Sequence, residues 1–144
     1  MKALFLLPVA ALALGGCAIT TEGTLTEPLK EKPDSVCVIQ NPAVAIANSA
    51  QIIEKALEKR GVDAVVCASK DDCKSQWHLT YVLYRRWDVV PYLAEGRMDL
   101  YKNGEVISSV DYSGGWGFNF AKFGHTAAKI DGMVGALISA EKGW

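Results

Sequence analysis

Two spacings of hydrophobic positions recur along the chain, and each predicts a type of element. Alternating apolar and polar positions, rich in β-branched and aromatic residues, predict five strands: 35–40, 62–67, 77–87, 93–102 and 105–112. Apolar side chains three or four residues apart predict helices over 42–60 and 121–140. The order βαββββα predicts an α+β fold, an antiparallel sheet with both helices on one face.

The ends of the helices carry recognisable residues. Asn41 caps the first helix and Pro42 is tolerated in its first turn, so the helix is expected to begin there and to end at Gly61. Gly132 and Gly135 each weaken the second helix by roughly 1 kcal/mol relative to Ala, and we expect them to permit close packing.

A hairpin is predicted where Asn103-Gly104 separates the last two strands. A type I′ turn needs positive φ at both central residues, which Asn and Gly supply. Across a two-residue turn Tyr101 is expected to face Val106, and Leu100 to face Ile107.

The first sixteen residues have the layout of a secretory signal. Lys2 precedes an apolar run over residues 3–14, which is shorter than the ~20 residues of a membrane span. The run ends in Leu14-Gly15-Gly16-Cys17, which resembles the bacterial lipobox. We therefore expect cleavage between Gly16 and Cys17 and attachment of diacylglycerol to the Cys17 thiolate.

The lipid defines the expected location and the division of the chain. Two or three acyl chains hold a protein on a bilayer effectively permanently. Residues 17–34 are polar with two prolines and are predicted to be a flexible tether, followed by one domain over residues 35–144. By resemblance to lipoproteins of double-membrane bacteria, Ala18 in place of an Asp favours the outer membrane, with the domain facing the periplasm.

Charge excludes one class of partner. Without Lys2, 14 basic side chains stand against 16 acidic ones, a formal charge of −2. There is no basic excess for a nucleic acid, and none is expected as a partner.

Three cysteines remain once Cys17 carries lipid. In an oxidising compartment one disulfide is expected among Cys37, Cys67 and Cys73, and all three pairings are open. Cys37–Cys73 is favoured because it closes the longer loop and leaves Cys67 within an apolar strand. The spacing of Cys67 and Cys73 does not suit a zinc site, so no metal is expected.

Aromatic side chains are the candidates for a binding surface. These are Trp77, Tyr81, Tyr84, Trp87, Trp116 and Phe118, the last two in a glycine-rich segment that matches no phosphate-binding motif. The alternative is that alternating aromatics form one face of a core. The acids Asp88, Glu95, Asp99 and Asp111 are candidates for a carboxylate pair, unless Arg86 or Arg97 neutralises them.

The chain also resembles the Sbal-type family of small bacterial lipoproteins. The resemblance covers nearly the whole mature domain and is carried by Val36–Pro42, Thr80-Tyr81, Trp87-Asp88, Tyr92, Arg97–Tyr101, Asn103-Gly104, Lys122-Phe123, Lys129-Ile130, Val134 and Leu137. That family has one cysteine in its first strand and another before its long strand, which supports Cys37–Cys73. It carries over no catalytic residues.

The expected function follows from location and from the lack of a catalytic motif. We expect a lipid-anchored, non-catalytic accessory protein of the envelope that contacts the membrane through Cys17 and binds an envelope partner. No cofactor is expected. The alternative is a module that binds a sugar, peptide or lipid through the aromatic residues and loop 113–120, and a hydrolase is the weakest candidate.

Overall fold

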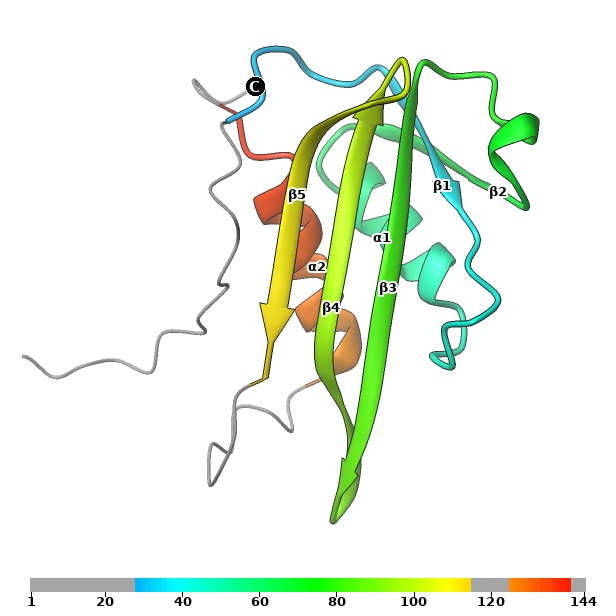
Figure 1. Cartoon of the computed structure of the whole chain (residues 1–144). Helices are drawn as coiled ribbons and strands as arrows, with labels where there is room; N and C mark the ends of the chain where they lie inside the picture. The colour runs from blue at the N-terminus through cyan, green and yellow to red at the C-terminus, as the bar shows by residue number, and fades with distance from the viewer. Residues whose placement is uncertain (1–27, 115–124, 141–144) are drawn as a thin grey trace, which may run out of the picture.

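A five-stranded sheet carries two helices on one face in the computed structural model, which describes residues 28–114 and 125–140 (Figure 1). Its elements in chain order are β1 (Ser35–Ile39), α1 (Ser49–Glu58), β2 (Asp63–Cys67), the short 3₁₀ helix η1 (Lys70–Asp72), β3 (Trp77–Asp88), β4 (Val90–Lys102), β5 (Glu105–Ser113) and α2 (Thr126–Leu137). The α+β class and the order βαββββα are confirmed.

The sheet is mixed, with strand order β2-β1-β3-β4-β5. β3, β4 and β5 pair antiparallel as predicted, but β1 is parallel to both β2 and β3. The correction has a simple cause. A strand, a helix and a strand in succession return the chain in its original direction, so β1, α1 and β2 form a parallel unit.

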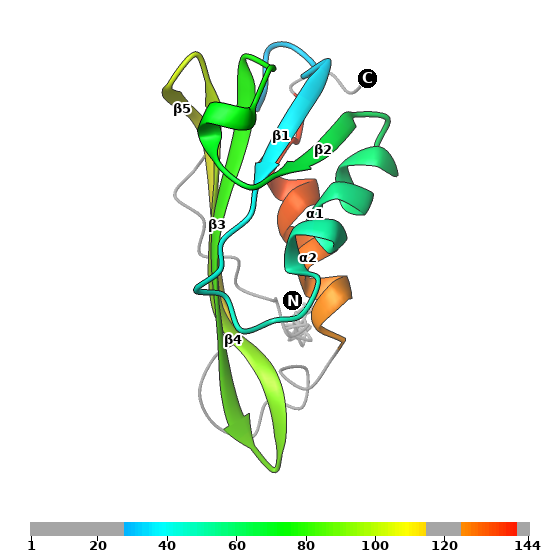
Figure 2. The same ribbon diagram turned by 90° about the vertical axis from the view of Figure 1, so that its right-hand side faces the viewer.

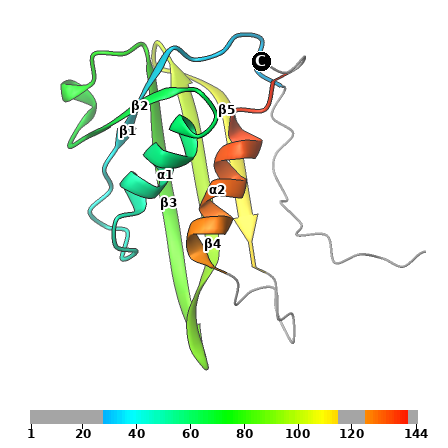
Figure 3. The same cartoon turned by 180° about the vertical axis from the view of Figure 1, so that it is seen from behind.

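Both helices lie on the same face of the sheet, as predicted (Figures 2 and 3). α1 packs against β1 and β2, and α2 packs against β4 and β5, so the two helices also contact each other. The core between helices and sheet holds Ile53, Leu79, Leu100 and Val134, each fully buried. Neither α1 nor α2 lies on the opposite face of β3, β4 and β5 (Figure 2).

The first helix begins later than the sequence suggests. Asn41 does not cap a helix: its carboxamide oxygen accepts from the Ala43 amide (3.0 Å), and its amide nitrogen donates to the Tyr81 carbonyl (2.9 Å). This local turn competes with helical hydrogen bonding, so α1 starts only at Ser49. Its end is as predicted, since Gly61 has φ +76° and Val62 donates back to Leu57 in a Schellman arrangement.

The described part of the second helix is shorter than predicted, and its expected residues 121–124 lie outside the described residues. Ile130, Val134, Leu137 and Ile138 of its apolar stripe are buried, whereas Ala127 is exposed. Burial in α2 begins at Ile130, and Ala127 and Ala128 before it are exposed.

The Asn103-Gly104 turn joins β4 and β5 as predicted, with φ +51° and +84°. Tyr101 faces Val106, but Leu100 faces Ser108 instead of Ile107 because a β-bulge interrupts the register. The Ser108 hydroxyl is buried and donates to the Leu137 carbonyl (2.6 Å), which ties β5 to the end of α2.

The packed domain starts before the predicted boundary at residue 35. Leu29 is 3% exposed within the core, and its amide donates to the Ser139 carbonyl (2.8 Å). Residues 28–34 therefore belong to the domain, and the part of the predicted tether before residue 28 lies outside the described residues.

Candidate functional site

The predicted site residues fall into three groups. Gly16 and Cys17, like Trp116 and Phe118, lie outside the described residues. The cysteines of the favoured pair are joined, with a Cα–Cα distance of 5.7 Å between Cys37 and Cys73, and Cys67 is free and buried. The remaining aromatic residues divide between the core and one end of the sheet.

Trp77 and Tyr81 are core residues, so the prediction that they form a binding surface is wrong for these two. They are 2% and 3% exposed, Trp77 at the start of β3 beside Pro28 and Leu29, and Tyr81 beside the start of α1. The Tyr81 hydroxyl accepts from the Ser49 hydroxyl (3.2 Å) and from the Asn41 amide (3.3 Å). Its polar end therefore fixes the loop before α1, and the face that carries these rings is an interior one.

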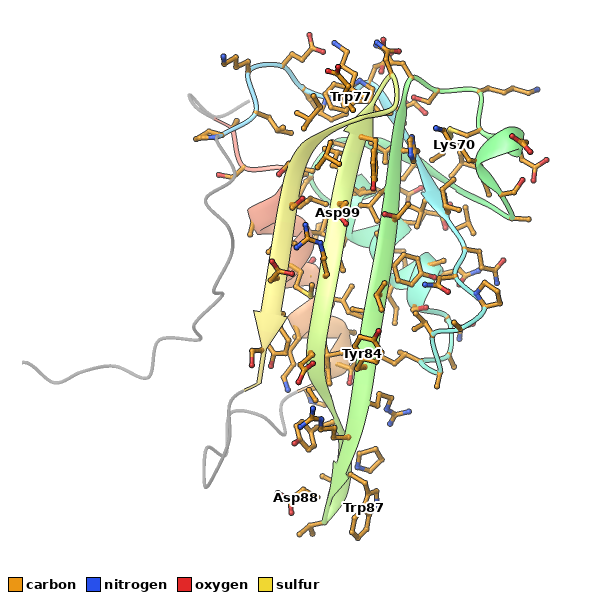
Figure 4. All side chains as sticks on the ribbon, in the orientation of Figure 1. Lys70, Trp77, Tyr84, Trp87, Asp88 and Asp99 are labelled. Carbon is orange, nitrogen blue, oxygen red and sulfur yellow. A yellow bond between two sulfur atoms is a disulfide. The ribbon has the colours of Figure 1, made fainter. Side chains whose placement is uncertain are left out.

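Exposed apolar side chains gather instead at the far end of the β3–β4 hairpin, over residues 84–91, which we name the hairpin tip. Trp87 is 75% exposed, Val89 78%, Tyr84 59% and Val90 45%. Figure 4 shows Trp87 and Asp88 where the hairpin extends past both helices. Large apolar side chains grouped in this way on a monomer mark an interaction site.

The turn within the hairpin tip is strained. Val89 has φ +63°, a left-handed conformation that β-branched residues rarely adopt. The turn is tight, because Asp88 and Val90 on either side of Val89 already pair. The sequence predicted Tyr84 and Trp87 as binding residues but not Val89 and Val90, because the predicted strands ended at residue 87 and began again at residue 93. In the structure Pro91 lies within β4 opposite Trp87. The signal for the hairpin tip in the sequence was the run Val89-Val90-Pro91, in which apolar residues are consecutive and do not alternate with polar ones.

Acidic side chains on the open face of the sheet are paired with arginines. Arg97 contacts both Asp99 (3.1 Å) and Asp111 (3.1 Å), and these carboxylates raise its pKa, the hydrogen bond that Arg97 donates to Asp99 contributing most. Nearer the tip, Arg86 contacts Glu95 at 2.9 Å. These three acids are therefore neutralised by arginines, which was the alternative to a carboxylate pair.

A histidine is buried on the same open face, beside the disulfide. His78 pairs with Cys37 across β1 and β3, and its ring stacks on Tyr101 with centroids 4.5 Å apart. The segment between β2 and β3 must return across β1, and the disulfide through Cys73 fixes it there. His78 is consequently only 6% exposed, and burial lowers its pKa, with a smaller contribution from Lys70.

A groove of about 340 Å³ lies at the opposite end of the sheet from the hairpin tip. Its apolar lining includes Pro28, Leu29, Trp77, Val106 and Ile107. Lys102 crosses it, paired with Glu31 and with its ammonium 5.2 Å from the centre of the Trp77 ring.

The described residues contain neither a metal-binding cluster nor a membrane-spanning helix. Within residues 28–114 and 125–140, histidine, cysteine and acidic side chains form no group of three that could hold a metal ion. In the same residues no helix is both long enough and apolar enough to span a bilayer.

Comparison with known proteins shows the fold alone. No protein-family model matches the sequence, and no curated protein matches it. Among solved structures, the chain is similar to the PelC dodecamer from Paraburkholderia phytofirmans, with 15% identity, a TM-score of 0.55, and coverage of 80% of this chain and 96% of that one. A variant of the same PelC superimposes with a TM-score of 0.52 at 15% identity, covering 79% of this chain and 94% of that one. The α+β arrangement described above is therefore one that a solved protein also adopts.

Proposed function

We propose that this chain is a lipid-anchored envelope lipoprotein whose domain binds a partner protein through the hairpin tip and performs no catalysis. The observation that carries the proposal is the exposure of Trp87, Val89 and Val90 together at the end of a hairpin that extends past both α1 and α2. Trp is enriched among the residues that dominate binding energy, and the exposed side chains around it would exclude water from the contact.

The remaining support comes from the acids and from the sequence. Asp99, Asp111 and Glu95 form ion pairs with arginines on an exposed face of the sheet. This pairing supports a structural role for the three carboxylates and not a role in general acid–base catalysis. The lipobox-like residues before Cys17 and the likeness to Sbal-type lipoproteins support the anchor, and Ala18 supports the outer membrane as its location.

A second copy of the chain is one partner to consider. PelC is described as a dodecamer, and the sheet of this chain has β2 and β5 as its two outer strands. Outer strands carry unpaired backbone groups that another strand can complete. Mass measurement of the purified domain across a concentration series tests self-association separately from the hairpin tip.

The experiment for the proposal places a photo-crosslinking amino acid at position 87 in cells. The expected result is a discrete adduct from position 87, lost when Val89 and Val90 are changed to Ser in the same chain. Position 65 is the matched control, because Val65 is 48% exposed on β2, away from the tip. Adducts that are absent at position 87, or equal at positions 87 and 65, would contradict the proposal.

A further inference from the structure

The end of the domain where the tether begins carries its own exposed apolar surface. Val106 is 53% exposed and Ile107 40% exposed, just after the β4–β5 turn. The two are adjacent in sequence, and alternation would normally send one of them into the core. The β-bulge in this stretch adds a residue to β5, so both side chains reach the surface.

The root of the tether forms one wall of the groove beside these side chains. Pro28 and Leu29 line the groove together with Val106 and Ile107. Leu29 is buried and hydrogen-bonded to Ser139, so the point from which the chain continues toward Cys17 is fixed on the domain. The groove, the apolar turn and the root of the tether thus share one end of the molecule.

The length of chain before Pro28 decides which end of the domain stays near the lipid. Eleven residues, Cys17–Glu27, span at most about 40 Å, and a random coil of that length averages about 18 Å. The hairpin tip lies at the other end of β3, about 36 Å away at ~3.3 Å per residue (Figure 4). A domain that stands with its tip against the bilayer needs a tether that is almost fully extended, whereas the groove end reaches the bilayer at any length of the tether.

We propose that the groove end rests on the phospholipid surface, with Val106 and Ile107 in the interfacial region. This inference depends on the lipid anchor in the proposed function. Lys30 lines the same groove and suits a lipid phosphate, whereas Lys102 is held by Glu31 and over the Trp77 ring. Two aliphatic side chains bind a bilayer weakly alone, but the anchor holds them at high effective concentration. The hairpin tip then points away from the membrane toward soluble partners.

The test uses the mature lipoprotein in vesicles of phosphatidylethanolamine with a minor fraction of phosphatidylglycerol. A nitroxide label is attached at Val106→Cys or, as a second position, Ile107→Cys, in a Cys67→Ala background that leaves the disulfide intact. Labels at Val65→Cys and Val89→Cys are the controls, since both positions are exposed and lie elsewhere. Collision with a water-soluble nickel complex is expected to fall severalfold at 106 and 107 upon vesicle attachment and to stay unchanged at 65 and 89.

Two outcomes would overturn the inference, and flotation of the vesicles distinguishes them. A protein that floats with the vesicles but shows equal accessibility at 106 and 65, or protection at 89, keeps its anchor and has a different orientation. A protein that does not float has no lipid anchor, and both this inference and the anchoring part of the proposed function then fail.

Discussion

Arg60 at the end of α1 holds Asp131 in the middle of α2 through two parallel hydrogen bonds, of 2.8 Å and 3.0 Å. The same guanidinium donates to the Asp131 carbonyl (3.0 Å) and to the Ala56 carbonyl (2.8 Å). The hydrogen bond from Arg60 is the main cause that lowers the pKa of Asp131. The Arg60 side chain therefore joins α1 to α2 and also satisfies a carbonyl in the last turn of α1.

Removal of this contact should destabilise the domain. Both side chains are about a quarter to a third exposed, so we expect Arg60→Ala to lower the free energy of unfolding by about 1–3 kcal/mol. Lys59→Ala is the matched control: Lys59 is 70% exposed and 3.6 Å from the same carboxylate, and its loss should cost less than about 0.5 kcal/mol. Urea denaturation of both variants measures the difference, and equal effects would contradict the assigned role.

The two glycines of α2 should respond in opposite directions to the same substitution. A Cβ on Gly135 would lie 2.8 Å from an Arg60 nitrogen, whereas a Cβ on Gly132 would meet nothing within 4 Å. We expect Gly132→Ala to raise stability by up to about 1 kcal/mol through helix propensity. Gly135→Ala should lower it by at least about 1 kcal/mol, because the guanidinium must leave its partners. Thermal unfolding of the pair checks this, and stabilisation by Gly135→Ala would show that Arg60 moves without loss.

The periodicity of the sequence was sufficient for the class of fold, the order of elements and the Asn103-Gly104 turn. Local signals of this kind depend on residues that are neighbours in the chain. Asn41 shows where they fail, because its competing partner is Tyr81, forty residues away. The parallel pairing of β1 and β2 differs from this case, because the strand–helix–strand succession that produces it is visible in the sequence.

The candidate site was predicted only in part, and the reason is geometric. Alternation assigns Trp77, Tyr81 and Trp87 to one face of a strand, but it does not say where along that strand the covering helices end. Tyr81 lies beside the start of α1 and Trp77 is covered by the segment that holds Leu29, whereas Trp87 extends past both helices and is exposed. Loop length favoured the Cys37–Cys73 pair. In the structure the pair forms because the segment that holds Cys73 crosses β1, where Cys37 lies.

Loss of the disulfide should lower the free energy of unfolding, because it releases the loop that crosses β1. Cys37 and Cys73 are 36 residues apart, which corresponds to about 3–4 kcal/mol in the chain-entropy model. The double variant Cys37→Ala with Cys73→Ala is expected to lose that amount in urea denaturation. Cys67→Ala is the control and should lose no more than about 1 kcal/mol, since its free thiol closes no loop. Similar losses in the two proteins would show that the bridge contributes little beyond packing.

Stability should fall as the pH is lowered from 7 to 5, because of His78. The folded pKa of this imidazole is lowered by burial, while the unfolded chain takes up a proton near the ordinary value of 6.5. The unfolded state therefore binds more protons below that pH, and the stability present above it is lost as the pH falls toward the folded pKa. Asp131 contributes a similar loss only below its ordinary value of 3.8, outside this range.

The measurement is the free energy of unfolding at a series of pH values. His78→Gln is expected to flatten the dependence between pH 7 and 5, whatever its effect on stability itself, whereas His125→Gln at the exposed start of α2 should preserve it. Because the disulfide holds the segment that buries His78, the reduced protein should also show a weaker dependence. An unchanged slope in His78→Gln would assign the effect to another group.

The anchor predicts a definite chemical product at the amino terminus. In cells given labelled palmitate, the wild-type protein should carry the label and Cys17→Ser should lose it, since only a thiolate forms the thioether. Cys67→Ser is the control and should stay labelled. Mass spectrometry should find mature chains that begin at lipid-modified Cys17, and a mature chain that begins elsewhere would contradict the prediction.

Ala18→Asp adds a test of location: by resemblance to other lipoproteins it should move the protein to the inner-membrane fraction, whereas an unchanged distribution would show that Ala18 does not direct it outward.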